Sequence, residues 1–384
     1  SLPSGFPAGL RTNPVTTPAA PARPSHLAAS RRGRPGDDPI FALNKEATAR
    51  RAKGESIVNA TLGSLLNDDG TLAILPTAAR AVKEVPAGEW AGYAPIAGTD
   101  PFLKAVIEDV FRGRAALASK ATAVATPGGT GALRHAISTF LEPGQALLTT
   151  SYYWNPYATI ADEQERRVET FAMFSATGAL DAAALDRALG AQMKRQGRAL
   201  LILNDPCQNP TGYSMSREDW AAVTAVLARH AEAGAVTVLL DAAYSAYGTA
   251  GDLSAPLAAL EPLVDRVLVL VAWTASKTFT HYGLRVGALV AIVPDAAERA
   301  ETSAALTYAC RGVWSNCNRG GLAAVTRLLT DPVLRPAVDA ERTTLVRLLG
   351  DRVAAFNAAA LAAGLDYPRY AGGFFTTVFP PDAE

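Results

Sequence analysis

The sequence predicts an α/β fold in which helices cover both faces of a mainly parallel sheet. Apolar, strand-like runs alternate with helix-like segments through the middle of the 384-residue chain, which is the pattern of such a sheet. Two of the runs, 200–203 and 236–240, show no alternation of polar and apolar residues, as expected of strands buried on both faces. Polar residues follow several runs directly, and open α/β sheets bind their ligands at such strand ends.

Seven strands are expected, at 122–126, 146–150, 168–172, 199–203, 236–240, 267–271 and 287–293. Helices are expected between many of them, at 130–141, 155–164, 181–191 and 216–232. Outside this core we expect helices at 40–51, 75–85 and 332–363, and strands at 56–62, just before Gly63, and at 369–379. Thr99 is expected to cap a further helix that carries Pro101 in its first turn.

We divide the chain into an arm and two domains. Residues 1–38 are expected to form a flexible, Pro-rich N-terminal arm, because eight prolines fall within the first 39 positions. Five arginines precede the first acid, so a targeting peptide is an alternative interpretation of this arm. Residues 86–325 would form the large domain, and 39–85 with 326–384 would form the two parts of a smaller α+β domain.

Composition excludes several classes of function. The 36 basic and 36 acidic residues balance, and no basic stripe indicates a nucleic acid or a membrane surface as partner. The apolar runs are too short and interrupted for a membrane-spanning helix. The three cysteines form no CxxC pair, which fits a reducing cytoplasm, and the four histidines show no metal-ligand spacing.

Lys277 stands in the stretch around which the rest of the chain is organised. It follows the apolar run 267–271, with Thr274 and Ser276 just before it and Arg285 eight residues after it. A lysine among small, uncharged residues loses solvation, so its pKa falls and its amine becomes nucleophilic. The hydroxyls and the arginine would suit a phosphate. Together they indicate pyridoxal phosphate (PLP), held as a Schiff base, although an exposed loop lysine would also fit this stretch taken alone.

Four other motifs follow predicted strands. The glycine-rich segment 127–134 opens a helix, so its amides and the helix dipole suit a phosphate, although a plain tight turn also fits. Asp241 ends a buried strand, where a carboxylate needs a partner. A protonated ring nitrogen would serve, and the alternative is that Asp241 caps the next segment of the chain. The turn 204–212 contains Asn209, whose amide can donate to a ring oxygen. Trp154 can stack on a flat ring or belong to the core.

The joint order of these motifs is specific. The chain resembles the class I aminotransferases of PLP fold type I, in particular the aspartate and aromatic aminotransferase group, in Gly128-Gly-Thr-Gly131, Trp154, Asn209-Pro-Thr-Gly212, Asp241-x-x-Tyr244, Ser276-Lys277 and Arg285. The resemblance runs from about residue 39 to 379. It implies a large domain with a mainly parallel, seven-stranded sheet and a smaller α+β domain.

The resemblance also implies a role for each matching residue. Lys277 would form the Schiff base and move the proton between the substrate Cα and the C4′ atom of the cofactor. Asp241 would keep the pyridine nitrogen protonated, and Tyr244 and Asn209 would donate to the phenolic oxygen. Trp154 would stack on the ring. The phosphate would be bound by Gly129, Thr130, Thr274, Ser276 and Arg285, with Gly128 in place of a common serine.

Two further matches imply a homodimer with shared active sites. Tyr93, in Tyr-x-Pro-Ile-x-Gly, would reach the phosphate in the neighbouring subunit. Arg311 would cross the interface and bind the side-chain carboxylate of a dicarboxylic substrate, or swing away for an aromatic one. Gly312 replaces a common proline beside it. Gly63 and Asn209 would lie against the substrate.

One departure concerns the substrate α-carboxylate. The family binds it with an arginine well downstream of a Gly-Gly-Phe-Phe-like strand. Here Gly372-Gly-Phe-Phe375 is present, but no arginine follows Arg369. We therefore expect a fragment that lacks the end of the small domain; otherwise another residue binds this group.

The sequence thus predicts a cytoplasmic, PLP-dependent aminotransferase. It would move an amino group from an aspartate-like or aromatic L-amino acid to 2-oxoglutarate by a ping-pong mechanism. A C–S β-lyase or a decarboxylase on the same fold, and a non-catalytic PLP-binding module, are alternatives. A nucleotide-binding protein is disfavoured because the usual phosphate fingerprints are missing. The expected partners are amino acids and 2-oxo acids, with no nucleic acid, membrane or metal.

Overall fold

The computed structural model describes residues 25–34, 36, 39–59, 61 and 63–379. The chain divides into two compact units, Ser1–Leu62 and Gly63–Glu384. Most of the predicted arm (1–24, 35 and 37–38) lies outside the described residues. The predicted domain boundaries at 38, 85 and 325 stay predictions.

In the first unit, a short 3-10 helix, η1 (Ala29–Arg31), precedes α1 (Pro39–Ala52), which confirms the helix predicted over 40–51. The strand predicted over 56–62 is wrong, since residues 56–59 and 61 belong to no helix or strand, and 60 and 62 are not described. Side chains take the place of a neighbouring strand: Arg51 donates to the Ile57 carbonyl at 2.8 Å, and Asn59 donates to the Asn44 side chain at 2.9 Å.

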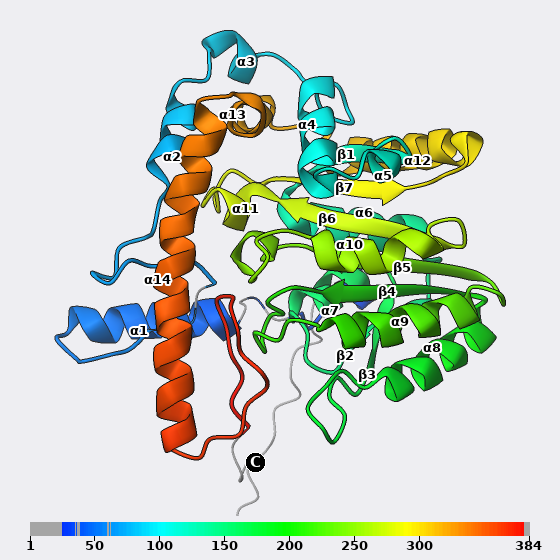
Figure 1. Cartoon of the computed structure of the whole chain (residues 1–384). Coiled ribbons are helices and arrows are strands. Elements are labelled where there is room, and N and C mark those ends of the chain that lie inside the picture. Colours follow the sequence, from blue (N-terminus) through cyan, green and yellow to red (C-terminus); the bar gives the residue numbers. More distant parts are fainter. Residues whose placement is uncertain (1–24, 35, 37–38, 60, 62, 380–384) are drawn as a thin grey trace, which may run out of the picture. The chain divides into compact units, whose positions relative to one another are not determined.

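The second unit is built on a seven-stranded sheet (Figure 1). Its strands are β1 (Ala121–Pro127), β2 (Ala146–Thr150), β3 (Arg167–Phe171), β4 (Arg198–Asn204), β5 (Ala235–Asp241), β6 (Val267–Thr274) and β7 (Val286–Ile292). They lie in the order β1-β7-β6-β5-β4-β2-β3, and β7 runs antiparallel to the other six, which are parallel to one another. The predicted, mainly parallel sheet is therefore confirmed.

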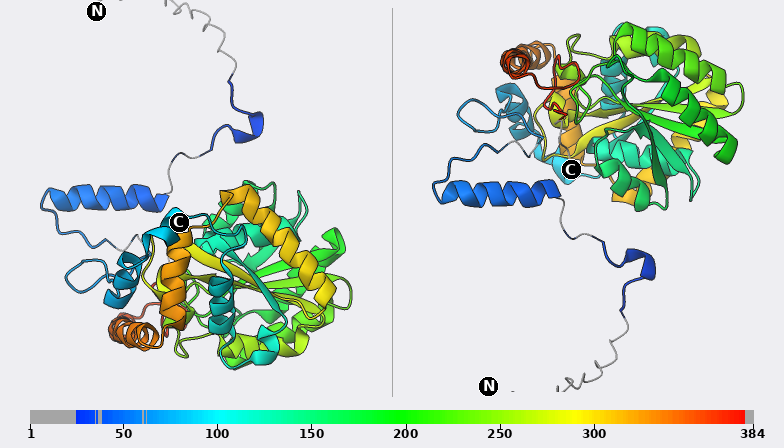
Figure 2. Two further views of the ribbon diagram at one scale, coloured as in Figure 1. Left: turned by 90° about the horizontal axis from the view of Figure 1, so that it is seen from above. Right: turned by 90° about the horizontal axis from the view of Figure 1, so that it is seen from below.

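Helices cover both faces of this sheet, as the views along its plane show (Figure 2). One face packs against α6 (Gly128–Phe140), α7 (Pro156–Asp162) and α12 (Ala296–Trp314). The other packs against α4 (Asp100–Phe111), α8 (Ala182–Gln196), α9 (Arg217–His230), α10 (Ser254–Leu260) and α13 (Arg319–Thr330). Because side chains alternate along a strand, Val269 and Val271 of β6 enter one core and Leu270 enters the other.

The remaining elements flank the sheet. They are α2 (Pro76–Lys83), α3 (Ala87–Ala91), α5 (Ala115–Ala118), η2 (Ser245–Tyr247), η3 (Glu261–Leu263), α11 (Ala275–Thr278) and α14 (Leu334–Ala362). The helices predicted over 75–85 and 332–363 are confirmed by α2 and α14. Thr99 does stand at the N-cap of α4, but its side chain makes no capping hydrogen bond.

The strand predicted over 369–379 is wrong. Only an isolated bridge between Asp366 and Phe379 forms in this segment. Gly373, at φ +90°, breaks the extended backbone, and aromatic packing replaces strand pairing. The Phe374 ring lies 5.3 Å from the ring of Tyr244 and 5.0 Å from that of Tyr247, centroid to centroid.

Candidate active site

The predicted site residues gather at the carboxyl edge of the sheet. β5 ends at Asp241, and β6 ends at Thr274, directly before the turn that carries Lys277. Arg285 reaches the same edge because β7 is antiparallel and begins there, with Gly287 opposite Thr274. The direction of β7, which the sequence pattern did not reveal, is thus what places the arginine beside the lysine turn.

Lys277 is half-buried on α11 and is surrounded by polar and aromatic groups. Its Nζ donates a hydrogen bond to the Gly63 carbonyl at 2.7 Å and lies 4.6 Å from the ring centroid of Tyr282. Among the described residues, no carboxylate forms an ion pair with it. Burial, with Arg285 nearby and Asp241 opposing, lowers the pKa of Lys277 to about 8. The amine is therefore a stronger nucleophile near neutral pH than a solvated lysine.

Asp241 is a buried carboxylate with few partners. The hydroxyl of Tyr157 donates to its Oδ2 at 2.6 Å, and the amide of Ala243 donates to its Oδ1 at 3.2 Å. Burial raises the pKa of Asp241, while these hydrogen bonds and Lys277 oppose the rise. A buried carboxylate at a strand end is suited to a cationic partner, such as a protonated ring nitrogen.

Tyr244 and Asn209 lie together on the same edge. The Asn209 side-chain amide donates to the Tyr244 hydroxyl at 3.5 Å, and Lys277 Nζ lies 5.9 Å from the Tyr244 ring centroid. Asn204, the last residue of β4, fixes the turn and the end of β5, since it accepts from the Asn209 amide at 2.7 Å and donates to the Asp241 carbonyl at 2.8 Å. Burial raises the pKa of Tyr244, so this hydroxyl keeps its proton and can donate it to an oxygen.

The predicted phosphate ligands also converge. Arg285 donates from Nη1 to Ser276 Oγ at 3.3 Å, and Thr274 Oγ1 lies 3.1 Å from the same oxygen and accepts from the Ser276 amide at 3.1 Å. Gly129 lies against Thr274, since a Cβ built there would be 3.5 Å from the Thr274 Cβ. Thr130 follows on the exposed surface of α6. Hydroxyls, a helix N-terminus and an arginine without a carboxylate partner in the described chain together suit a phosphate.

The structure explains why position 128 is a glycine and not the serine that is common there in the family. Its φ of +69° disfavours any side chain, and a Cβ at this position would run into the Arg285 guanidinium. Arg285 therefore occupies the space that a side chain at 128 would need. Taken with the buried lysine, the carboxylate and the Tyr244 hydroxyl, this arrangement fits an aldehyde-bearing, phosphorylated ring such as PLP.

The Gly-Gly-Phe-Phe segment forms one wall near the lysine. A Cβ on Gly63 would lie 2.9 Å from the Phe375 ring, so this close contact requires glycine. The Phe375 ring in turn lies 5.9 Å from the ring of Tyr244. Gly63 thus contributes to the site in two ways. Its carbonyl accepts a hydrogen bond from Lys277, and its lack of a side chain leaves room for the Phe375 ring.

Three predicted residues lie further out. Trp154 is half-buried and meets the ring of Tyr157 edge-on, 5.9 Å between centroids, so it is linked to Asp241 through that tyrosine. Tyr93 is 88% exposed. Arg311 lies exposed in the last turn of α12, where it donates to the Ser315 hydroxyl at 3.0 Å. The structure does not bring Tyr93 or Arg311 into contact with Lys277.

Sequence reasoning missed three site residues. Tyr157 stands on α7, and no motif marked it because its partner, Asp241, lies 84 residues away in the sequence. Tyr282 was hidden between Lys277 and Arg285, and only the fold turns its ring toward the lysine. Asn204 begins the predicted turn 204–212, and the signal for its role is a side-chain amide at a strand end, which can bond to the next strand.

Other places fit the chemistry less well. A cavity of about 510 Å³ lies at the amino ends of β5 and β6, at the opposite edge from Lys277, and no predicted site residue lines it. Arg369, the last arginine of the sequence, is held by the Ser214 carbonyl at 2.6 Å. The described residues contain no group of three or more His, Cys, Asp or Glu placed to hold a metal ion. None of the helices that the structure describes has the length and apolar character of a membrane span.

Comparisons with known proteins agree with this geometry. A family model described as "Aminotransferase class I and II" matches residues 55–383. The chain is 31% identical over 265 residues to the aromatic-amino-acid aminotransferase of Paracoccus denitrificans, a match that covers 67% of this chain and 64% of that protein. It is 28% identical to the aspartate aminotransferase of Pseudomonas aeruginosa, covering 78% of this chain and 74% of the relative.

Solved structures show the same fold. An aminotransferase from Anaerococcus prevotii superposes with a TM-score of 0.85 at 32% identity, covering 92% of this chain and 87% of that one. The aromatic-amino-acid aminotransferase of Burkholderia pseudomallei, solved with covalently bound pyridoxal phosphate, superposes with a TM-score of 0.74 at 24% identity, covering 88% and 84%.

These matches confirm the predicted aspartate and aromatic aminotransferase group, its PLP-dependent transferase fold of type I, and PLP as the cofactor. The chain spans 64% of the length of the first of these two curated relatives and 74% of the second. Because the family model covers most of the sequence, the chain belongs to the class I and II aminotransferase family.

Proposed function

We propose that this chain is a PLP-dependent aminotransferase that moves an amino group from an aspartate-like or aromatic L-amino acid to 2-oxoglutarate. The observation that carries the proposal is a half-buried lysine of lowered pKa beside a buried carboxylate and a phosphate-binding group of hydroxyls and arginine. Its relatives named for aspartate and for aromatic amino acids support both substrate classes.

Different residues at the carboxyl edge of the sheet would bind different parts of the cofactor. Thr274, Ser276 and Arg285, with the amides of Gly129 and Thr130, would hold the phosphate. Asp241 would pair with the ring nitrogen, and Tyr244 with Asn209 would donate to the ring oxygen, while Trp154 would cover the ring. When bound, PLP supplies an aldehyde that exchanges one amine for another and a ring that withdraws electrons from the substrate Cα.

Lys277 would be the base and acid of the reaction. With its pKa lowered to about 8, a large fraction of its Nζ is neutral near that pH and can take a proton from the substrate Cα. Gly63 and the Tyr282 ring hold this amine at the edge of the site. The same Nζ would return the proton at the C4′ position of the cofactor, two atoms along from the substrate Cα, which is the proton movement a transamination needs.

Substrate choice would depend on Arg311. Its exposed guanidinium at the end of α12, held by Ser315, would bind the side-chain carboxylate of aspartate, glutamate or 2-oxoglutarate across a dimer interface. The 88% exposure of Tyr93 supports the same homodimer, because a tyrosine so exposed is free to contact a second subunit. Two half-reactions in a ping-pong order, each using one carboxylic substrate at this site, follow from this proposal.

We further propose a cytoplasmic location. The three cysteines are free and buried, which agrees with a reducing compartment. In that compartment amino acids and 2-oxo acids are the small-molecule partners.

The function is tested with the purified holoenzyme and a panel of L-amino acids. We expect aspartate or an aromatic amino acid to give its 2-oxo acid together with one equivalent of glutamate when 2-oxoglutarate is present. Lys277→Ala should abolish turnover and the absorbance of the Schiff base with PLP, whereas Lys104→Ala, at an exposed lysine of α4, should change neither.

Other outcomes identify the alternatives. Release of carbon dioxide with formation of an amine and no oxo acid would indicate a decarboxylase. Release of a thiol with ammonia and an oxo acid, but without glutamate, would indicate a C–S lyase. PLP binding with no turnover of any amino acid would indicate a binding module. Activity retained in Lys277→Ala would overturn the proposal.

A further inference from the structure

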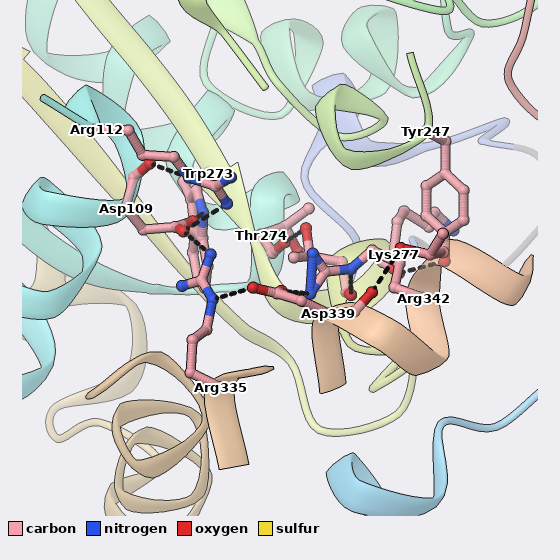
Figure 3. A network of polar contacts seen from close by, with 11 residues as sticks. Asp109, Arg112, Tyr247, Trp273, Thr274, Lys277, Arg335, Asp339 and Arg342 are labelled. Carbon is pink, nitrogen blue, oxygen red and sulfur yellow. Dashed lines mark hydrogen bonds and ion pairs between the residues drawn. The ribbon is translucent and has the colours of Figure 1, made fainter. Parts of the chain in front are cut away.

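The helix that carries Lys277 is too short to hold its own shape. α11 has four residues, so contacts from neighbouring elements must fix it. Two side chains do so at its carboxyl end (Figure 3): the Tyr247 hydroxyl donates to the Lys277 carbonyl at 3.1 Å, and Arg342 Nε donates to the Thr278 carbonyl at 2.9 Å. The position of the lysine backbone therefore depends on residues far away in the sequence.

Arg342 is itself held tightly. Its Nη2 donates to Asp339 Oδ1 at 2.7 Å, and its guanidinium carbon lies 5.4 Å from the ring centroid of Phe279. The side chain is 8% exposed. A planar guanidinium that uses one edge on a carboxylate and another on a carbonyl has little freedom left, so it transmits the position of its helix to the lysine turn.

Further contacts lead from Asp339 back to Trp273, so that these side chains and the chain segment 273–278 form a closed ring of contacts. Asp339 Oδ2 accepts from Arg335 Nε at 2.7 Å, and Arg335 Nη2 donates to Asp109 Oδ1 at 3.0 Å. Asp109 Oδ2 accepts from Trp273 Nε1 at 3.1 Å, and Trp273 stands in β6, next to the last residue before α11. The ring thus touches the chain on both sides of Lys277. We refer to its members, Asp109, Trp273, Arg335, Asp339 and Arg342, as the lysine clamp (Figure 3).

Three elements build the lysine clamp. Arg335, Asp339 and Arg342 stand at four- and three-residue spacing on α14, so they share one face of that helix. Asp109 comes from α4, where Arg112 also donates to it at 2.9 Å. The clamp therefore links two helices of distant sequence to the strand and turn that carry the lysine.

Two charged members of the clamp, Asp109 and Arg342, are shielded from water. The Asp109 side chain is 7% exposed. Burial alone would raise the pKa of Asp109, but Arg112 and Arg335 hold it below its ordinary value, so the group stays ionised. Removing one member of such a set leaves another charge unpaired, and the remaining members must rearrange.

We propose that the lysine clamp sets the position of Lys277 and that Arg342 is its principal positioning residue. By holding Trp273 on one side and the Thr278 carbonyl on the other, the clamp keeps the lysine amine where an aldehyde-bearing phosphate can be attached. This inference rests on the proposed function, because it concerns how Lys277 meets its cofactor. The residues involved lie outside the motifs that predicted the site.

A purely structural role would give a different result from a positioning role. Pyridoxamine phosphate has an amine in place of the aldehyde and cannot react with Lys277, so its dissociation constant reports only the phosphate and ring contacts. Attachment of pyridoxal phosphate also needs the lysine. A positioning residue should change the attachment rate and leave pyridoxamine phosphate binding intact, whereas a damaged fold should weaken both.

The experiment compares full-length apoproteins of the wild type, Arg342→Gln and Arg352→Ala. Arg352 is the matched control, because it also stands on α14 and binds a carbonyl and a carboxylate, those of Leu66 and Asp68. Attachment of pyridoxal phosphate is followed by absorbance, and pyridoxamine phosphate binding by calorimetry. We expect Arg342→Gln to slow attachment about tenfold, with pyridoxamine phosphate affinity within about twofold of the wild type, and Arg352→Ala to change neither.

An unchanged attachment rate in Arg342→Gln would overturn the proposal, as would equal effects of both variants. Should Arg342→Gln fail to fold, Asp339→Asn serves instead, since this side chain is 40% exposed and can be rehydrated. It should slow attachment in the same direction by a smaller factor, and a wild-type rate there would count against the clamp. A wild-type protein that never attaches pyridoxal phosphate would instead refute the proposed function.

Discussion

Lys277 shows how the surroundings of one residue set its chemistry. Burial and the nearby Arg285 lower its pKa to about 8, although Asp241 acts in the opposite direction. The neutral amine is the reactive form, so it becomes available about two pH units lower than in a solvated lysine of ordinary pKa about 10.4. The two hydroxyls that lie near it, those of Tyr244 and Tyr282, have raised pKa values and stay neutral in this range.

This shift predicts the pH dependence of cofactor attachment. In the apoprotein, the rate constant for covalent attachment of pyridoxal phosphate should rise with pH and level off above about 8, because Lys277 is then deprotonated. Stopped-flow absorbance at a series of pH values measures this, with Nα-acetyl-lysine as the solvated reference. A rate that keeps rising to pH 10, as the reference should, would contradict the lowered pKa.

Asp241 depends on a partner that its motif does not contain. Tyr157 is fully buried and donates to Oδ2 at 2.6 Å, and this hydrogen bond opposes the rise that burial causes in the pKa of Asp241. A hydrogen bond to a charged group contributes about 1.5–3 kcal/mol. We therefore expect Tyr157→Phe to lower kcat about tenfold or more and to weaken PLP binding, as measured by steady-state kinetics and cofactor titration.

Tyr153→Phe is the matched control for this change. The ring of Tyr153 stacks on that of Tyr157 at 6.1 Å between centroids and 13° between planes, so each substitution removes one hydroxyl from the same stacked pair and leaves both rings in place. Only Tyr157 touches the carboxylate. Similar losses in both variants would show that removal of either hydroxyl from this pair has the same effect, and that the hydrogen bond to Asp241 is not the cause.

At the scale of elements, residues at the start of α6 and at the start of β7 together form the proposed phosphate-binding site. Gly128, at φ +69°, has no side chain and so leaves space for the Arg285 guanidinium. The Gly128 amide also donates to the Arg285 carbonyl at 3.1 Å. We expect Gly128→Ala to push the flexible arginine aside and to weaken PLP binding about tenfold. Isothermal titration with PLP measures the loss.

Gly144→Ala separates this effect from backbone strain. Gly144 also has a positive φ, +82°, but a Cβ there would meet nothing within 4 Å. Both substitutions should lower stability by about 1–2 kcal/mol, the cost of a side chain in the left-handed region. If Gly144→Ala weakened PLP binding as much as Gly128→Ala, displacement of Arg285 would not be the cause.

Elements that repeat a simple period were predictable, and those fixed by distant partners were not. The seven strands follow from apolar runs, and they bring Asp241 and Lys277 to one edge as expected. The segments 56–62 and 369–379 also have strand-like residues, but side-chain hydrogen bonds and aromatic packing satisfy them instead. Tyr157 and Arg342 could not be assigned to the site, because each acts through a contact more than sixty residues away in sequence.

At the scale of the whole molecule, two predicted residues remain outside the site of a single chain. Tyr93 is 88% exposed and Arg311 is exposed at the end of α12, and neither contacts Lys277. Large exposed side chains of this kind are suited to an interface. A homodimer that shares its sites would give both residues a function that one subunit cannot supply.

Mixed dimers test this sharing directly. Each Lys277→Ala subunit keeps Tyr93, and each Tyr93→Phe subunit keeps Lys277. If Tyr93 serves the partner's site, a mixed dimer has one complete site, because the intact lysine of one subunit meets the intact tyrosine of the other. Random mixing of equal amounts should then make about a quarter of all sites complete.

The measurement is transaminase activity at a PLP concentration too low to load the Tyr93→Phe homodimer. After subunit exchange, activity should rise above the mean of the two parent proteins toward that fraction of the wild type. If Tyr93 acted within its own subunit, mixing would create no complete site and activity would stay at the mean. The two arrangements contain the same residues in the same numbers, so any gain must come from their placement across the interface.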